Sequence, residues 1–122
     1  MHRISLQTLK CKIDRGDRFV LVSALNPGQF NRMHIPGSIN VHDRSDLKAY
    51  LRPDDEIIVY CTEAGCPRSI VLGQFLSSSG FRHVQRFDGG LRSWVEAGLP
   101  TSQDVAWNIV PMQARRQLRK AQ

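Results

Sequence analysis

The sequence has few cysteines and no long hydrophobic run, and both absences exclude classes of protein. The 122-residue chain contains three cysteines, Cys11, Cys61 and Cys66. An odd count argues against a disulfide framework, and the lack of a Cys-x-x-Cys pair argues against structural zinc. His34 and His42 alone make a poor metal site, so we expect no metal ion and no other cofactor.

No stretch approaches the roughly 20 apolar residues of a membrane-spanning helix. The first residues also lack the apolar core of a signal peptide. We therefore expect no membrane partner and a cytoplasmic location, where thiols stay reduced.

Aromatic residues are scarce too, at 7% of the chain, and they are not interleaved with the basic residues. The net charge is +6, and part of the excess lies near the C-terminus, at Arg115, Arg116, Arg119 and Lys120. A basic balance favours anionic partners. Without interleaved aromatic side chains, however, the pattern disfavours nucleic-acid binding. Nothing in the composition predicts the oligomeric state.

Short apolar runs alternate with segments of helical periodicity along the chain. Apolar runs rich in β-branched residues are typical of buried parallel strands, which we expect over 18–24 and 56–61. We also expect a short strand over 38–41, after the Pro36-Gly37 turn, and a strand over 81–87, through Val84 and Phe87. Helices are expected between Ser5 and Gly16 and over 29–33, 45–51, 69–79 and 91–97. Such alternation requires parallel pairing with crossover helices. The sequence therefore predicts a small three-layer α/β domain with a central, mainly parallel sheet of about four or five strands flanked by helices.

The hydrophobic periodicity weakens after Pro100. Residues 101–110 show no clear period, and 112–122 have the pattern of a polar, basic helix with few apolar anchors. We therefore divide the chain into one domain, residues 1–100, and a basic, partly helical C-terminal extension, residues 101–122.

Cys61 occupies the position on which we base the functional prediction. It lies at the end of the apolar run 56–61, and a short loop separates it from the helix expected from Ser69. Backbone N–H groups at a helix start lack partners and carry partial positive charge, so a loop in front of them forms an anion cradle. The same field should lower the pKa of the Cys61 thiol below about 8.5. The residues predict a nucleophilic sulfur beside an anion site.

Several motifs, in this order and spacing, resemble a rhodanese-homology domain over about four fifths of the chain. The resembling residues are His34-Ile35-Pro36-Gly37-Ser38-Ile39-Asn40, Ile58-Val59-Tyr60-Cys61, Arg68-Ser69, Gly80-Phe81 and Asp88-Gly89-Gly90-Leu91-x-x-Trp94-x-x-Ala97-Gly98-Leu99-Pro100. The resemblance implies a single-domain rhodanese-like sulfurtransferase. In that family, the cysteine at the position of Cys61 takes sulfane sulfur from an anionic donor such as thiosulfate. It then passes the sulfur, as a persulfide, to cyanide or to a thiol, which can belong to a protein.

The resemblance implies that Cys61 is catalytic and that the following loop binds the substrate. The substrate-binding candidates are Thr62, Glu63, Ala64, Gly65, Cys66, Pro67, Arg68 and Ser69. Arg68, if it points towards the loop, adds a fixed positive charge. Ser69 is placed either to cap the helix or to bond the sulfur, whereas Glu63 is expected to point to solvent.

The sequence departs from the family pattern at the loop and at the first buried strand. The six residues from Thr62 to Pro67 make a longer loop than is usual. Cys66 is either a resolving thiol that closes a disulfide with Cys61 or a small residue that shapes the loop. After the first strand, Ser23 and Leu25 replace a frequent Asp-x-Arg pair.

These departures keep two other functions open. One is a non-catalytic or regulatory rhodanese-like module that binds a protein partner. The other is a phosphatase or arsenate reductase of related fold, but the loop length does not match the cradle that those enzymes use for a tetrahedral oxyanion.

Overall fold

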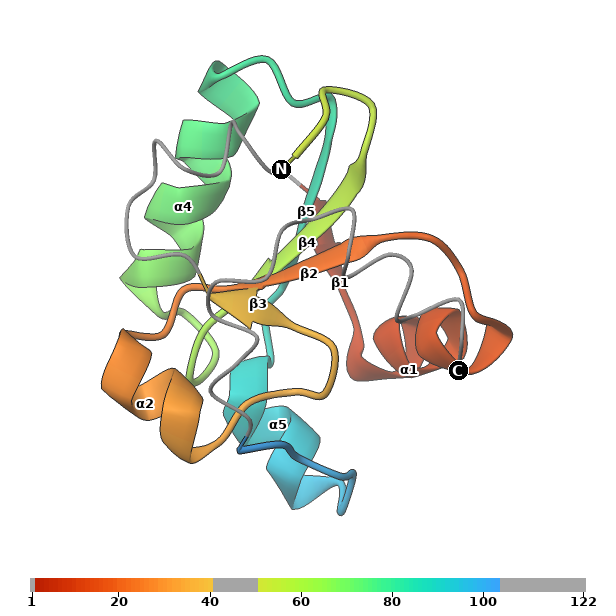
Figure 1. The fold of residues 1–122 in the computed structure, drawn as a ribbon, viewed down its shortest axis with the longest axis vertical. Helices are drawn as coiled ribbons and strands as arrows, with labels where there is room; N and C mark the ends of the chain where they lie inside the picture. The colour runs from red at the N-terminus through yellow and green to blue at the C-terminus, as the bar shows by residue number, and fades with distance from the viewer. Residues whose placement is uncertain (1, 41–50, 104–122) are drawn as a thin grey trace.

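Five parallel strands form a single sheet in the computed structural model, which describes residues 2–40 and 51–103 (Figure 1). The strands are β1 (His2–Ile4), β2 (Val20–Ser23), β3 (Ile39–Asn40), β4 (Glu56–Tyr60) and β5 (His83–Phe87). Their order is β1-β5-β4-β2-β3, and every neighbouring pair is parallel. The central position belongs to β4. The sheet confirms the predicted α/β architecture.

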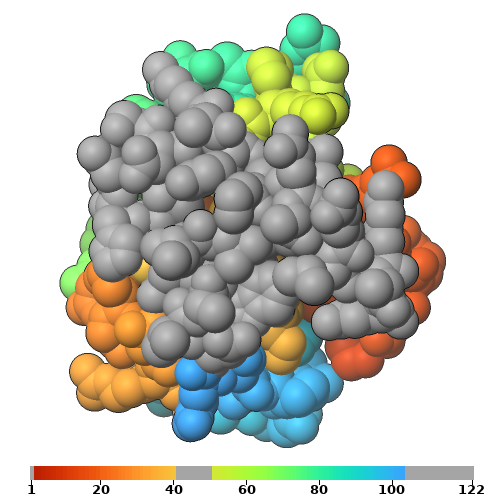
Figure 2. Space-filling model, in the orientation of Figure 1, coloured from red at the N-terminus to blue at the C-terminus, as the bar shows by residue number. Residues whose placement is uncertain are grey.

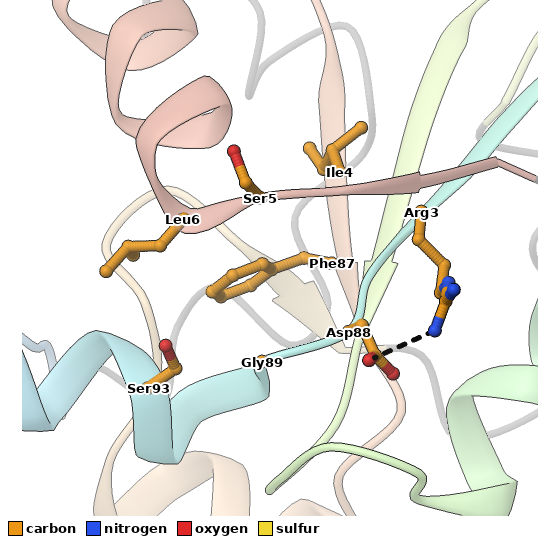
Figure 3. A pocket seen from close by; sticks show the side chains of 8 residues that line it. All are labelled: Arg3, Ile4, Ser5, Leu6, Phe87, Asp88, Gly89 and Ser93. Atoms are coloured by element: carbon orange, nitrogen blue, oxygen red, sulfur yellow. Dashed lines mark ion pairs between the residues drawn. The ribbon is translucent and has the colours of Figure 1, made fainter.

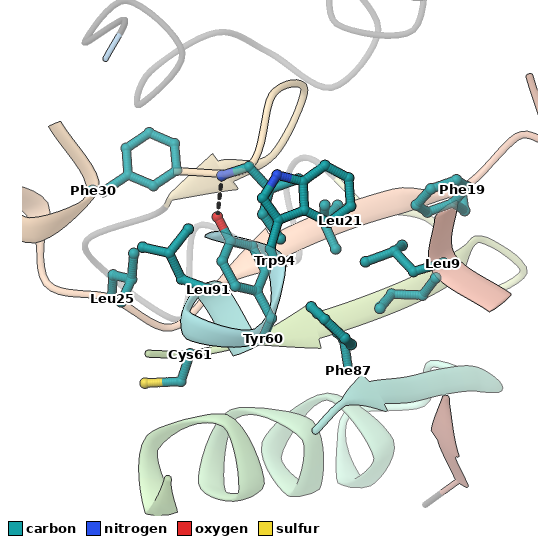
Figure 4. Packing of buried hydrophobic residues seen from close by; sticks show 12 residues of the cluster. Leu9, Phe19, Leu21, Leu25, Phe30, Tyr60, Cys61, Phe87, Leu91 and Trp94 are labelled. Atoms are coloured by element: carbon teal, nitrogen blue, oxygen red, sulfur yellow. Dashed lines mark hydrogen bonds between the residues drawn. The ribbon is translucent and has the colours of Figure 1, made fainter. Parts of the chain in front are cut away.

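Helices cover both faces of the sheet. They are α1 (Leu6–Arg15), α2 (Pro27–Arg32), α4 (Pro67–Ser78) and α5 (Gly90–Glu96). Residues of α1, α2 and α5 share one buried cluster, and residues of α4 belong to a second. On β4, Ile58 and Tyr60 enter the first cluster, shown in Figure 4, whereas Ile57 and Val59 enter the second. Alternate side chains of a strand point to opposite faces, so β4 is buried on both.

Local sequence signals account for the ends of α1. Ser5 is the N-cap, and its side chain accepts a hydrogen bond from the Thr8 amide at 3.1 Å. Gly16 ends the helix with φ of 73°, a left-handed conformation that glycine adopts without steric cost. Both ends agree with the sequence prediction.

The boundaries differ from the prediction most clearly at β1, α2 and α4. Strand β1 was not expected, because its three residues, two of them exposed and polar, carry no periodic signal; it forms by pairing with the edge of β5. Helix α2 begins at Pro27, two residues before its predicted start. Helix α4 begins at Pro67, two residues before the predicted Ser69, because proline has helical φ and needs no amide partner at the first turn. Residues 45–50 of the predicted helix 45–51 lie outside the described residues.

Just before the end of the described region, the chain pairs with the segment that follows α2. His34 and Ser102 form an antiparallel bridge through two backbone hydrogen bonds of 2.9 and 2.8 Å. Figure 2 shows the two segments, orange and blue, at the lower edge of the molecule. Residues 104–122, which include most of the predicted extension, lie outside the described residues, and the division at Pro100 stays a prediction. Among the described helices, none is long and apolar enough to cross a membrane.

Candidate active site

Cys61 directly follows the last residue of β4, at the carboxyl end of the central strand. Its side chain is only 1% exposed. In Figure 4 its sulfur points away from the packed aromatic side chains. Ligands of parallel α/β sheets bind outside the carboxyl ends of the strands. Cys61 is therefore at the edge where this class of sheet places its chemistry.

Tyr60 fixes the strand immediately before the cysteine. Its hydroxyl group accepts a hydrogen bond from the Ile35 amide at 3.2 Å and shares a 2.7 Å hydrogen bond with the Ser38 hydroxyl group. All three residues are buried, so these bonds are shielded from water. The motif from His34 to Asn40 thus positions the end of β4. No role for Tyr60 was predicted, because its position before Cys61 does not reveal hydrogen bonds to residues more than 20 positions away.

The first turn of α5 supports the other side of the cysteine loop. The Leu91 amide donates to the Cys61 carbonyl at 2.8 Å, and the Arg92 amide donates to the Thr62 carbonyl at 2.7 Å. This contact requires Gly90, since a Cβ there would lie 2.7 Å from the Cys61 carbonyl oxygen. The Asp-Gly-Gly motif therefore permits close packing of α5 against the loop.

The loop from Thr62 to Cys66 curls back on itself in front of α4. The Cys66 amide donates to the Glu63 carbonyl at 3.2 Å, which closes a turn. None of the hydrogen bonds among the described residues uses the backbone N–H of Glu63 or Ala64. These two donors, both on exposed residues, are available to an anion at the loop.

The two loop cysteines interact directly, and their pKa values move in opposite directions. Burial, followed by the hydrogen bond with Cys66, raises the pKa of the Cys61 thiol. Burial also opposes ionisation of Cys66, but the hydrogen bond from Cys61 and the backbone N–H groups of Arg68 and Ser69 lower the pKa of its thiol. The prediction of a lowered pKa for Cys61 was therefore wrong. Cys66, as the N-cap residue of α4, is the thiol that receives the field of the helix start.

Thr62 adds two donors to the Cys61 sulfur. Its hydroxyl oxygen lies 3.6 Å from the sulfur, and its backbone N–H also favours the thiolate. Thr62 is therefore suitably placed to stabilise negative charge on the Cys61 sulfur.

The side chains of three other loop candidates have partners other than the Cys61 sulfur. Arg68 is exposed and donates to the Gln29 side chain of α2 at 3.1 Å. The Ser69 hydroxyl group donates to the Cys66 carbonyl at 3.1 Å, so it neither caps α4 nor bonds a cysteine sulfur. Glu63 is exposed but forms a 3.0 Å ion pair with Arg92. The substrate-binding role of these side chains stays a prediction.

Hydrogen bonds, not an ion pair, are formed around Ser23 and Leu25, the residues that replace the Asp-x-Arg pair. The Ser23 hydroxyl group accepts from the Leu25 amide at 3.0 Å. The Asn40 side chain donates to the Leu25 carbonyl at 2.6 Å. Hydrogen bonds to the backbone therefore hold the corner after β2 in this chain. Nowhere in residues 2–40 and 51–103 do three or more His, Cys, Asp or Glu side chains gather in a way that could hold a metal ion.

Asp88 connects the loop to an open hollow beside β1. Figure 3 shows its carboxylate facing Arg3, at 3.7 Å, on the hollow's rim. On the loop side it accepts a 3.4 Å hydrogen bond from the Gly65 amide, and Arg86 is a further partner. Burial raises the pKa of the carboxyl group, but the Gly65 amide and the two arginines outweigh burial and lower it. Asp88 is ionised at neutral pH and holds the middle of the loop.

Replacing Asp88 by asparagine should destabilise the protein at pH 7 by about 1 kcal/mol. Asparagine can still accept a hydrogen bond from the Gly65 amide, but it lacks the negative charge. The loss is modest because solvent partly screens this side chain. The folded-state pKa is lowered from 3.8. The stabilisation is therefore complete above 3.8 and is lost as the pH falls through the folded pKa. Urea unfolding of both proteins at pH 7 and near pH 3 measures this difference.

Asp54→Asn is the matched control, because Asp54 pairs with Arg82 at 3.2 Å but both side chains are largely exposed. It should change stability little at either pH. A difference between wild type and Asp88→Asn that stays constant from pH 7 to pH 3 would exclude the charge as its cause.

The arrangement of the strand, the cysteine loop and the two following helices defines a known family. Residues 5–97 match the sequence profile of the rhodanese-like domain. The chain belongs to the rhodanese-like family, whose members include sulfurtransferases.

Two relatives by sequence are a sulfurtransferase and a transcriptional regulator. The chain is 29% identical over 110 residues to the thiosulfate:glutathione sulfurtransferase of Saccharomyces cerevisiae, covering 77% of this chain and 78% of the yeast protein. It is 34% identical over 77 residues to an HTH-type transcriptional regulator of Mycobacterium tuberculosis. That match covers 62% of this chain and 34% of the regulator, so the chain spans about a third of that relative.

A solved structure shows the same fold. The thiosulfate sulfurtransferase from Pseudomonas aeruginosa superposes with a TM-score of 0.73 at 24% sequence identity. The match covers 85% of this chain and 20% of the Pseudomonas protein. At this identity the likeness establishes the fold alone.

Proposed function

We propose that the protein is a sulfurtransferase that carries sulfane sulfur as a persulfide on Cys61. The donor is a small anion of the thiosulfate type, and the acceptor is cyanide or a thiol, including a thiol on a protein. The observation that carries the proposal is the position of Cys61, at the end of the central strand with the Thr62 N–H and hydroxyl groups at its sulfur.

The first half-reaction requires a thiolate at Cys61. The Cys61 proton is lost to solvent, and the Thr62 hydroxyl and backbone N–H groups favour the resulting thiolate. The Cys61 thiolate then attacks the outer sulfur of thiosulfate, the sulfur–sulfur bond of the donor breaks, and sulfite leaves with the bonding electron pair. Donors around the loop stabilise the negative charge that builds on the leaving group.

The second half-reaction removes the outer sulfur. A nucleophilic acceptor attacks that sulfur, and Cys61 leaves as a thiolate, which the Thr62 groups stabilise. Cyanide would yield thiocyanate, and a thiol would yield a persulfide of the acceptor. The loop residues from Glu63 to Gly65 are exposed, which leaves the mouth of the site accessible to a larger acceptor.

A sulfite burst tests the first half-reaction. Thiosulfate in slight excess, without an acceptor, should release about one equivalent of sulfite per chain, and cyanide should convert the burst into steady thiocyanate formation. Sulfite is counted because its release does not depend on what later happens to the persulfide.

A second function becomes the better assignment if no donor of this class releases a leaving group from the folded protein. The burial of Cys61 and the raised pKa of its thiol both reduce reactivity, and they favour a non-catalytic or regulatory module that binds a protein partner. An inactive but folded protein, checked by circular dichroism, would overturn the sulfurtransferase proposal.

A further inference from the structure

The loop places two thiols in contact at the candidate active site. Cys61 and Cys66 are hydrogen-bonded to each other through their side chains. Cys66 also packs against the buried cluster that contains Cys61. Neither sulfur is engaged in a disulfide, since both cysteines are free. The sulfur that would become the inner atom of a Cys61 persulfide therefore already touches a second thiol.

The local structure holds Cys66 in this place. It is the N-cap residue of α4, which fixes it at the start of a twelve-residue helix. Its amide donates to the Glu63 carbonyl, so the loop folds back towards Cys61. Cys66 is also more accessible than Cys61, being half-buried rather than 1% exposed. A residue that only filled space at this turn would not need a hydrogen bond to the nucleophile.

We propose that Cys66 is a resolving thiol that attacks the inner sulfur of the Cys61 persulfide, closes a Cys61–Cys66 disulfide and releases the outer sulfur as hydrosulfide. This proposal rests on the proposed function, because it begins from the persulfide. It adds a second product, and it makes the protein a source of hydrosulfide whenever no acceptor is present.

The step balances without an external oxidant. The bond between Cys66 and the Cys61 sulfur forms, and the bond between that sulfur and the outer sulfur breaks. The two thiols are oxidised by two electrons, and the sulfane sulfur is reduced to hydrosulfide. The proton of the Cys66 thiol leaves on the hydrosulfide. A thiol or dithiol reductant then returns the disulfide to the two cysteines, which completes the cycle.

Attack on the inner sulfur is favoured over attack on the outer one. The Cys66 side chain interacts with the Cys61 sulfur itself, which is the inner sulfur of the persulfide, and it packs against the buried cluster that contains Cys61. Attack at the inner sulfur expels hydrosulfide, whereas an external acceptor attacks the outer sulfur. The lowered pKa of Cys66 also supplies a larger thiolate fraction for the attack.

Intact mass and hydrosulfide release test the proposal together. Wild type, Cys66→Ser and Cys11→Ser are treated with thiosulfate without acceptor, quenched in acid and weighed. Wild type should lose about 2 Da and release about one equivalent of hydrosulfide, whereas Cys66→Ser should gain about 32 Da and release at least about tenfold less. Cys11, which is exposed on α1, is the matched control, and its variant should behave as wild type.

Tryptic digestion locates the change. Cleavage after Lys48 and Arg68, with Arg52 protected by Pro53, yields a single peptide, residues 49–68, that contains both loop cysteines but not Cys11. In wild type this peptide should carry the 2 Da loss, and dithiothreitol should reverse it. Cys66→Ala repeats the test if the serine variant does not fold.

Each other outcome separates the two proposals. A stable gain of about 32 Da on wild type, with no hydrosulfide, would overturn the resolving role while the proposed function stands. The same gain located on Cys66 would also overturn it and make Cys66 a relay. No sulfite burst and no gain in any variant would overturn the proposed function itself.

Discussion

Replacing Cys61 by serine is expected to abolish sulfur transfer from thiosulfate to cyanide, lowering kcat by at least about a thousandfold. A serine hydroxyl group is a poor nucleophile towards sulfane sulfur and cannot form a persulfide. The loop should stay folded, because the backbone bond from the Leu91 amide goes to the carbonyl of residue 61, not to its side chain. Thiocyanate formation measured across thiosulfate concentrations separates the loss of kcat from any change in KM.

Cys11→Ser is the control for the general loss of a thiol, and it should retain wild-type turnover because Cys11 lies exposed on α1. The thermal unfolding midpoint of both variants should stay close to that of wild type. If Cys61→Ser kept substantial turnover, the persulfide would have to form elsewhere, and Cys66 would be the next candidate. That result would also remove the basis for a resolving role.

The fold could be predicted from the sequence because its signals are local and repeated. Apolar runs marked β2 and β4, Val84 and Phe87 marked β5, and Ser5 and Gly16 marked the two ends of α1. Strand β1 has no such signal, since its three residues are extended only by pairing with β5. An edge strand of this kind is defined by a partner that lies some 80 residues away in the chain.

The place of Cys61 in the fold could be predicted, but the electrostatics around it could not. Strand, loop and helix in sequence were enough to place Cys61 at the end of a buried strand, before a loop and the start of a helix. Which thiol receives the helix field depends on the path of the loop, and the structure makes Cys66 the N-cap residue. The pKa of the Cys61 thiol is raised, opposite to the prediction, and the pKa of the Cys66 thiol is lowered. Side-chain contacts of this kind are not encoded in spacing.

Distant segments also support the site in ways that spacing does not reveal. Tyr60 forms hydrogen bonds with Ile35 and Ser38, and Asp88 forms one with Gly65. Each joins residues that lie 22 to 25 positions apart in the chain. Tyr60, Ile35, Ser38 and Asp88 all belong to the motifs that carried the family resemblance, so those motifs supply the contacts that support the loop. Their separation in sequence hides the fact that they converge on one loop.

Replacing Gly90 by alanine should destabilise the protein by about 3 kcal/mol, the second large effect we expect. Gly90 has φ of 68°, which costs an alanine about 1 kcal/mol. The new Cβ would also lie 2.7 Å from the Cys61 carbonyl oxygen and 2.8 Å from the Glu63 amide nitrogen. These are backbone atoms that cannot rotate away, so overpacking should add about 2 kcal/mol. Thermal unfolding should show a midpoint lower by about 10 °C or more.

Gly98→Ala separates the two contributions, because Gly98 has a similar φ of 75° at the other end of α5 but nothing within 4 Å of the added Cβ. It should cost only the conformational contribution, about 1 kcal/mol, and leave the sulfite burst intact. Gly90→Ala should weaken the burst as well, measured below its unfolding transition, because relief of the clash displaces the Cys61 carbonyl. Equal losses of stability in the two variants, with equal bursts, would mean that close packing of α5 against the loop does not position the nucleophile.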